Sequence, residues 1–179
     1  MNKCVCAITG HRPSRFKFKY SEDYTICKKI KANMLEVFRK LYDEKEVRCF
    51  YVGGALGVDM WAAEQILRLK EQPGYEDIEL VVALPFVGHD AKWDQRSKRR
   101  MEFILQHCSR KDVIGNEDCR ESYIKRNCYM VDQANYLVAV YDDARNLRSG
   151  TMQCVRYARE NDVPVVLIHP DTSNITYPM

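Results

Sequence analysis

Short apolar segments alternate with longer amphipathic segments along almost the whole chain. The apolar segments are rich in β-branched and aromatic residues, as in Val47–Val52, which favours strands. The segments between them repeat apolar residues at helical spacing, as Ile26, Ile30 and Met34 do. Strands that alternate with helices are joined by right-handed crossovers, which place helices on both faces of a parallel sheet. The sequence therefore predicts a Rossmann-like α/β fold, a three-layer sandwich with a mostly parallel central sheet.

The same patterns give the expected position of each element. A first helix is expected from a cap at Ser21 through Leu41, and Pro85 is expected to end a strand. The expected strands are Cys4–Thr9, Val47–Val52, Ile78–Leu84, Asp112–Gly115, Asn135–Tyr141 and Val163–His169, of which the last closes the sheet. The other expected helices are Asp59–Glu71, Asp94–Cys108, Glu121–Ala134 and Thr151–Glu160.

Size and charge exclude several classes of protein. A chain of 179 residues fits one domain, residues 1–179, and can bury about 70% of the surface of its unfolded form without a metal or disulfide. The net charge of +3 is too small to indicate a nucleic-acid binder by itself. No apolar run approaches the ~18 residues of a membrane span, so no membrane partner is expected. The sequence is compatible with a homo-oligomer and does not define the oligomeric state.

The eight cysteines do not follow the spacing of a metal site. They form no C-x-x-C pair and no paired Cys/His pattern, and several lie inside apolar segments, where free cysteine behaves as a small hydrophobic residue. The apolar stretch at the N-terminus is too short for a secretory signal. We therefore expect reduced thiols in a cytoplasmic protein, with no metal and no cofactor.

Three turns that follow expected strands contain glycine, and the central one is Gly53–Asp59. In an open parallel sheet, ligands bind outside the carboxyl ends of the strands, near the point where the strand order reverses. Glycines at such a turn let backbone N–H groups approach an anion, and the helix N-terminus adds partial positive charge. The same glycines could also serve only to permit a tight turn. The segment has neither the Gly-Lys-Ser/Thr of a P-loop nor the G-x-G-x-x-G of a dinucleotide fingerprint.

The other two turns add cations and hydroxyl groups at the same expected edge. In the first turn, Arg12 offers a fork for an anion, and His11 could hydrogen-bond a ligand or exchange a proton. The third turn carries Arg145 and Arg148 before Ser149, which could simply cap the following helix. Together the three turns predict a pocket for a nucleotide or another phosphorylated small molecule.

These motifs resemble those of the SLOG superfamily, named for its SMF/DprA-like and LOG-like members, and most closely those of its YspA/YpsA-like branch. Ile8–Pro13 is similar to the opening motif of that branch, and Gly53–Glu64 to its central signature. Leu84-Pro85-Phe86 with Trp93, and Ser149-Gly150-Thr151 with Tyr157-Ala158, complete the pattern. The resemblance runs from about Lys3 to His169 and implies a Rossmann-like pocket for a nucleotide or nucleotide-derived ligand, in a protein that could act as a sensor. The turns and the resemblance together give these candidate ligand-binding residues: Gly10, His11, Arg12, Gly53, Gly54, Gly57, Asp59, Pro85, Phe86, Arg148, Ser149, Gly150 and Thr151.

The LOG-like branch implies an alternative function, hydrolysis of the N-glycosidic bond of nucleoside monophosphates. Its members use a Gly-Gly-x-Gly-Thr-x-x-Glu turn, whereas here Ser149 replaces a glycine and Cys154 stands at the glutamate position. A cysteine cannot supply that carboxylate. The remaining catalytic candidates are Asp59 and Glu64, which point about 140° apart around a helix and are not expected to act on one bond together.

The branch of DNA-processing protein A implies a second alternative, binding of single-stranded nucleic acid. The segment Arg15–Tyr20 interleaves three cations with three aromatic residues, which in an extended chain lie on opposite faces. The rings could stack on bases. They could also pack inward beneath a solvated basic face, and we favour this arrangement.

Overall fold

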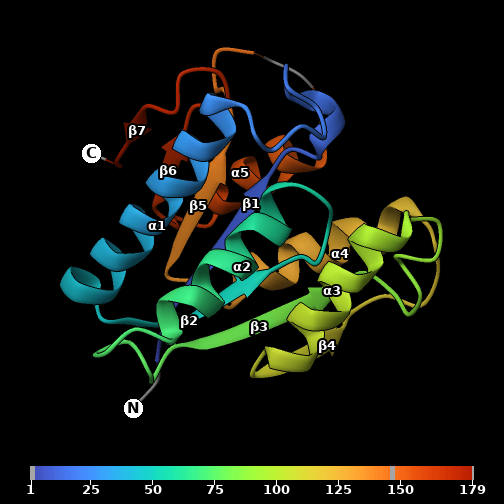
Figure 1. Ribbon diagram of the computed structural model, residues 1–179, viewed down its shortest axis with the longest axis horizontal. Coiled ribbons are helices and arrows are strands. Elements are labelled where there is room, and N and C mark those ends of the chain that lie inside the picture. The colour runs from blue at the N-terminus through green and yellow to red at the C-terminus, as the bar shows by residue number, and fades with distance from the viewer. Residues whose placement is uncertain (1–2, 146–147, 179) are drawn as a thin grey trace.

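The structure is a computed structural model that describes residues 3–145 and 148–178 (Figure 1). In these residues the sheet has the strand order β4-β3-β2-β1-β5-β6-β7. The strands are β1 (Cys4–Gly10), β2 (Val47–Val52), β3 (Glu79–Leu84), β4 (Arg110–Val113), β5 (Tyr136–Val140), β6 (Val165–Ile168) and β7 (Ile175–Thr176). The helices are a short 3₁₀ turn, η1 (Pro13–Arg15), and the α-helices α1 (Thr25–Lys45), α2 (Val58–Lys70), α3 (Gln95–His107), α4 (Arg120–Asp132) and α5 (Gly150–Glu160).

The strand order reverses beside β1. The chain first builds β2, β3 and β4 outward on one side of β1, then returns to place β5 and β6 on the other side. Strands β1 to β6 pair in parallel, and Gly10 at the end of β1 lies opposite Val140 at the end of β5. Parallel sheets of this kind bind ligands at such a reversal. The fold therefore directs attention to the turn that follows β1.

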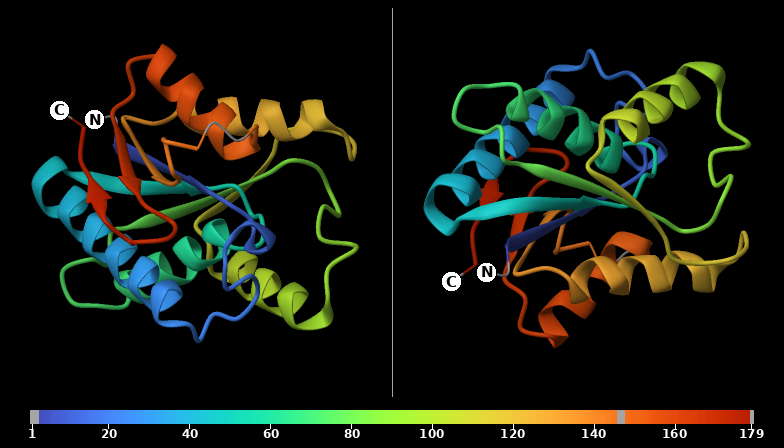
Figure 2. Two further views of the ribbon diagram at one scale, coloured as in Figure 1. Left: turned by 90° about the horizontal axis from the view of Figure 1, so that it is seen from above. Right: turned by 90° about the horizontal axis from the view of Figure 1, so that it is seen from below.

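Helices cover both faces of the sheet (Figure 2). One face packs against α1, α2 and α3, through residues such as Met34, Trp61 and Ile104. The other face packs against α4 and α5, through residues such as Met130 and Val155. Within the described residues, no helix is both long and apolar enough to span a bilayer. The predicted three-layer sandwich with a mostly parallel sheet is confirmed.

Some element boundaries differ from the predicted ones. Helix α1 begins at Thr25, and Ser21 does not cap it; the residue at the N-cap position is Tyr24. The strand predicted at Val163–His169 does not close the sheet, because β7 pairs antiparallel to β6 beyond it. A strand of two residues is too short to show the period-two pattern on which strand prediction depends.

All eight cysteines are free thiols. Four of them are buried in the two apolar layers, namely Cys6, Cys27, Cys49 and Cys154. Burial raises the pKa of the Cys27 and Cys49 thiols to about 11, so these side chains are neutral at pH 7. They contribute to the core as small apolar groups, as the sequence predicted.

Candidate functional site

A cavity of about 1140 Å³ opens beside the carboxyl end of β1, between α4 and α5. Its lining includes Thr9–Arg12 from the turn after β1, Arg148–Gln153 at the start of α5, and residues from the first turns of α4. Two residues of the central glycine turn, Ala55 and Asp59, also line it. The turns after β1 and before α5, predicted to share one ligand, are thus brought together at the strand reversal.

The central glycine turn packs tightly against the turn after β1. Val58 N–H donates to the His11 carbonyl oxygen at 3.5 Å. A Cβ atom on Gly10 would lie 2.5 Å from Val58 Cγ2, and one on Gly57 would lie 2.7 Å from the His11 carbonyl oxygen. Gly57 also has a φ of +86°, which side chains rarely tolerate. The glycines at these two positions let the two turns touch.

Polar groups of the central turn are engaged by the protein itself. Arg126 Nη1 donates to the Gly53 carbonyl oxygen, and His89 Nε2 contacts the Gly54 carbonyl oxygen at 2.8 Å. Ala55 N–H donates to Asp59 Oδ2 at 3.1 Å. Of the candidate ligand-binding residues in this turn, Asp59 lines the cavity, whereas Gly53, Gly54 and Gly57 lie outside the lining. The assignment of these three glycines to the ligand stays a prediction.

Asp59 and Arg126 form a buried charged floor to the cavity. Their exposed fractions are 7% and 5%. Burial raises the pKa of Asp59 and lowers that of Arg126, while the opposite charge of each partner counteracts both shifts. A Cβ atom on Gly53 would lie 2.4 Å from Arg126 Nη1 and 2.7 Å from Asp59 Oδ2, so the backbone of Gly53 passes close to both groups. The floor therefore places a carboxyl and a guanidinium group at the base of the cavity, where both are largely shielded from solvent.

The thiol of Cys154 lies beneath this floor and outside the cavity lining. It is fully buried, and burial raises its pKa to about 12. The thiol is therefore neutral and has no route to a ligand in the cavity. The position at which LOG-like enzymes need their glutamate does not contribute a reactive group here.

His11 is buried at the cavity wall, with an exposed fraction of 7%. Its ring packs near Phe16 and Tyr141, with centroid distances of 6.2 and 5.9 Å. Burial lowers its pKa, and the charge of Arg15 acts in the same direction, so the imidazole is neutral at pH 7. Nδ1 has no hydrogen-bond partner among the described residues. This nitrogen is itself buried, so it is not exposed to the cavity, and a buried polar atom without a partner is costly.

Ser149 caps α5, because its Oγ accepts a hydrogen bond from Met152 N–H at 3.0 Å. It also lines the cavity together with Gly150 and Thr151. Asn127 of α4 holds this turn, since its Nδ2 donates to the Gly150 carbonyl oxygen at 3.4 Å. Asn127 Oδ1 in turn accepts from Arg126 Nε at 2.9 Å. The pair Arg126–Asn127 thereby links the central glycine turn to the turn before α5.

Arginines dominate the charge of the cavity. The six that line it are Arg12, Arg15, Arg120, Arg126, Arg148 and Arg156, against the acidic Asp59, Asp118 and Glu160. Glu160 is paired with Arg156 at 2.7 Å. Arg145, which the sequence placed at the same ligand, instead pairs with Asp142 at 3.3 Å and Asp171 at 3.1 Å and lies outside the lining. Because these carboxylates hold the side chain outside the lining, contact of Arg145 with a ligand in the cavity stays a prediction.

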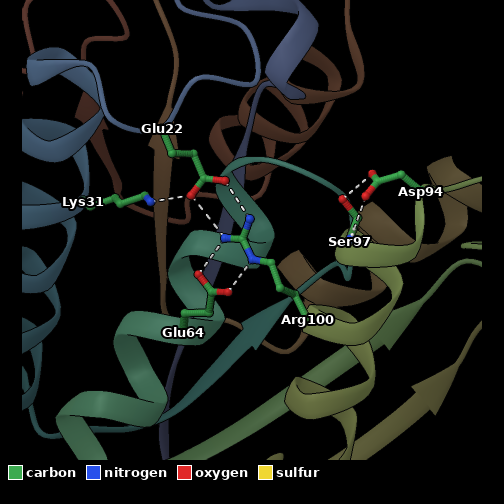
Figure 3. Close-up of polar contacts among 6 residues, drawn as sticks. All are labelled: Glu22, Lys31, Glu64, Asp94, Ser97 and Arg100. Carbon is green, nitrogen blue, oxygen red and sulfur yellow. Dashed lines mark hydrogen bonds and ion pairs between the residues drawn. The ribbon is translucent and has the colours of Figure 1, made fainter.

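Glu64, one of the two catalytic candidates, is outside the cavity lining and belongs to a network of ion pairs (Figure 3). Its carboxylate accepts hydrogen bonds from Arg100 Nε at 2.8 Å and Nη2 at 2.9 Å. Arg100 also donates to Glu22 at 2.6 and 3.1 Å, and Lys31 contacts the same Glu22 carboxylate. Both oxygens of Glu64 are thus hydrogen-bonded within a network of ion pairs that joins α2, α3 and the segment before α1.

Pro85 and Phe86 are buried and lie outside the lining. The Pro85 carbonyl oxygen accepts from Gly115 N–H at 2.8 Å. The Phe86 ring meets the Tyr123 ring edge to face, with centroids 5.7 Å apart. Because Tyr123 does line the cavity, Phe86 supports the wall from behind. Direct contact of these two residues with a ligand stays a prediction.

The segment Arg15–Tyr20 is not an extended strand with one aromatic face. Phe16 and Phe18 are buried, stack at 4.9 Å and pack against Trp61, whereas Tyr20 is exposed. The inward packing of the rings, favoured from the sequence, is confirmed for Phe16 and Phe18. These two rings are therefore not available to stack on bases.

Sequence reasoning missed the contribution of α4. Tyr123, Arg126 and Asn127 all line the cavity, and none belongs to a glycine turn. One signal was present: Arg126 precedes the buried Met130 by four positions and therefore lies on the inward face of the helix. An arginine on the apolar face of a helix needs a buried partner, and such positions are candidates for a site.

The chain was compared with known protein families and sequences. Residues 6–173 match the model of the YspA SLOG family. A UPF0398 protein of Bacillus cereus strain B4264 is 28% identical over 145 residues, which cover 79% of this chain and 76% of the relative. A UPF0398 protein of Bacillus cereus strain G9842 is 30% identical over 146 residues, with the same coverage.

Two solved structures share the fold. DNA processing protein A from Helicobacter pylori, described for its single-stranded DNA binding mode, has 18% sequence identity and a TM-score of 0.57. DNA processing protein A from Streptococcus pneumoniae has 17% identity and a TM-score of 0.57. The matches cover 93% and 92% of this chain, but only 65% and 50% of the two neighbours.

Proposed function

Because the chain belongs to the YspA SLOG family, we propose that its cavity beside β1 binds a nucleotide or a nucleotide-derived small molecule. The observation that carries the proposal is the excess of arginine around one cavity, six guanidinium groups against three carboxylates. Arginine presents a planar fork that matches phosphate oxygens in pairs. A surface that gathers these groups in a concave site favours a phosphorylated ligand.

The exposed arginines supply the charge that a phosphate would meet. Arg12, Arg15, Arg120 and Arg148 are exposed and line the cavity, and none of them has a carboxylate within ion-pair distance among the described residues. Four cations that repel one another persist on one surface at a cost in stability. A bound anion removes that repulsion, which is a direct source of binding free energy.

Other groups of the cavity suit the rest of a nucleotide. Gly150 and Thr151 begin α5, where backbone N–H groups lack partners within the helix and favour an anion. His11 lines the same wall, and the floor formed by Asp59 and Arg126 can hydrogen-bond the hydroxyl groups of a sugar. Tyr123 offers an aromatic ring in the same wall. Phosphate, sugar and base each meet a suitable partner.

The proposed role is binding, in the manner of a sensor, and it includes no reaction. Cys154 is buried below the floor, and Glu64 is paired with Arg100, so neither can act on a ligand in the cavity. Asp59 lines the cavity but also accepts the hydrogen bond that shapes the central turn. An N-glycosidic hydrolase would leave a free base after incubation with AMP or NAD, and we expect none.

The proposal is tested by titration calorimetry and thermal shift with AMP, ADP-ribose, NAD and a cyclic dinucleotide, with adenosine as the uncharged control. At least one phosphorylated ligand is expected to raise the melting temperature and to bind with micromolar affinity, while adenosine does neither. Replacement of one exposed cavity arginine in Arg148→Ala is expected to weaken that binding about tenfold or more, since it removes a charge-assisted hydrogen bond.

The matched control is Arg68→Ala, which removes an arginine that is also exposed but lies on α2, outside the cavity. This variant is expected to bind as the native protein does. If no phosphorylated nucleoside binds, or if both variants lose affinity equally, the proposed site is wrong.

A further inference from the structure

The exposed arginines of the cavity belong to two walls. Arg12 and Arg15 begin and end one short turn, in which Arg15 N–H donates to the Arg12 carbonyl oxygen at 3.0 Å. Their side chains nevertheless reach different elements. The Arg12 guanidinium carbon lies 5.4 Å from the centre of the Tyr123 ring on α4, whereas Arg15 Nη2 donates to the Arg148 carbonyl oxygen, just before α5, at 3.4 Å.

Each wall also carries arginines of its own, besides the arginine of the turn after β1 that approaches it. Arg120 is the first residue of α4 and lies one turn before Tyr123, on the wall that Arg12 approaches. Arg148 and Arg156 belong to the wall of α5, which Arg15 approaches. The positive charge is thus arranged as an α4 group, Arg12 and Arg120, and an α5 group, Arg15 and Arg148.

The cavity has room for a ligand larger than a single phosphate group. Pockets for drug-sized ligands usually measure roughly 300–1,000 Å³, and this cavity measures about 1140 Å³. The buried polar groups His11 and Asp59 line the same cavity as the two groups of arginines. A single phosphate could engage one group of arginines and would leave the other uncompensated.

We propose that the cavity takes a ligand with two phosphate groups separated by a nucleoside, one phosphate for the α4 group and one for the α5 group. This inference rests on the proposed function and makes it specific. It predicts that a nucleoside 3′,5′-bisphosphate or a 5′-phosphorylated dinucleotide binds better than AMP. It also predicts that ADP, whose two phosphates are adjacent, binds less tightly than the ligands whose phosphates are separated.

Calorimetry with AMP, ADP, adenosine 3′,5′-bisphosphate and the 5′-phosphorylated dinucleotide pApA tests the inference at constant ionic strength. The best separated-phosphate ligand is expected to bind at least tenfold tighter than AMP and tighter than ADP. Arg120→Ala and Arg148→Ala remove one arginine from each group. Each variant should reduce the affinity for the separated-phosphate ligand about tenfold, whereas the affinity for AMP should fall in only one of them.

The outcomes separate this inference from the proposed function. If AMP binds as tightly as the separated-phosphate ligands, or if one of the two variants has no effect on any ligand, the two-group arrangement is wrong and the nucleotide site stands. If none of the four ligands binds but ADP-ribose, NAD or the cyclic dinucleotide does, this inference is wrong and the nucleotide site stands; if no phosphorylated nucleoside binds at all, both proposals fail. Binding that grows with oligonucleotide length and falls steeply with salt, without binding of pApA, overturns the inference in favour of a single-stranded nucleic acid. Arg68→Ala is again the control, with unchanged affinities expected.

Discussion

Arginine occurs in two opposite settings in this protein. Arg100 is three-quarters buried, with a side-chain exposure of 24%. Its guanidinium group donates hydrogen bonds to two carboxylates, those of Glu22 and Glu64 (Figure 3). Four exposed arginines of the cavity have no carboxylate within ion-pair distance among the described residues, namely Arg12, Arg15, Arg120 and Arg148. The ion pairs of Arg100 join α3 to α2 and to the segment before α1. Those four arginines of the cavity join no segments through ion pairs among the described residues.

The largest effect is expected when the paired arginine is removed in Arg100→Met. The substitution keeps much of the side-chain volume but leaves Glu22 and Glu64 close together without their shared cation. Breaking a buried ion pair from one side is strongly destabilising, and for these partly buried groups we expect a loss of about 3 kcal/mol in the free energy of unfolding. Urea denaturation measures it.

Arg99→Ala is the matched control for this variant, because Arg99 is the neighbouring residue of α3 and is exposed. Its free energy of unfolding should change by about 0.5 kcal/mol or less. A similar small change in Arg100→Met would show that the network contributes no more than a surface pair, and the contrast with the cavity would disappear.

Acidification is expected to lower the free energy of unfolding by an intermediate amount. Burial opposes the ionisation of Glu22, but hydrogen bonds from Arg100 and Lys31 outweigh it and lower its pKa from 4.5 to about 2. Since the pKa is lower in the folded protein than in the unfolded chain, the stabilisation is complete above about pH 4.5 and is lost as the pH falls toward 2. We expect a loss of about 2 kcal/mol over this range after allowance for partial exposure.

Urea denaturation of native protein and of Glu22→Gln at several values between pH 5 and pH 2 measures this dependence. The glutamine variant should lose less stability on acidification, because the titrating carboxyl is absent. Glu102→Gln, at an exposed position on α3, should follow the native curve. Parallel curves for all three proteins would contradict the assignment of the shift to the network.

The smallest effect on stability is expected in the cavity. The double variant Arg12→Ala/Arg148→Ala removes two exposed cations that have no carboxylate partner among the described residues, so its free energy of unfolding should stay within about 0.5 kcal/mol of the native value. Relief of repulsion between like charges favours a slight gain at low salt. Denaturation at two salt concentrations checks both statements. A loss of about 2 kcal/mol or more would mean that these arginines serve the fold, as Arg100 does.

Much of the fold could be predicted because its pattern is local. Val47–Val52 is a strand in the structure with the same bounds, and the predicted helix at Asp94 begins one residue later, where the Asp94 carboxylate accepts a hydrogen bond from Ser97 N–H at 3.0 Å. Both rest on short-range preferences of neighbouring residues. The segment before α1 could not be predicted in this way, because Phe16 and Phe18 are positioned by Trp61, more than forty positions later.

In the candidate site too, the residues marked by local sequence signals could be predicted, and those positioned by distant contacts could not. The turns at Thr9–Arg12 and Arg148–Thr151 could be found because a glycine or a capping serine marks them in the sequence. Arg126 could not be distinguished from Lys125 by residue type, although one is buried and the other is exposed. Its role depends on the carbonyl oxygen of Gly53, a contact between residues 73 positions apart. Only the packing of α4 on the sheet brings the two together.

The central place of β1 has a consequence for the order in which the molecule is assembled. This strand comes before the other six strands in the sequence of the described residues, yet its pairing with β5 joins residues about 130 positions apart, such as Cys6 and Tyr136. Such distant contacts form late, because the intervening chain must first be ordered. Arg12 follows β1 and Arg148 follows β5, so the two arginines can line one cavity only after β5 has paired beside β1. A chain that stops before α5 therefore lacks one wall of the cavity.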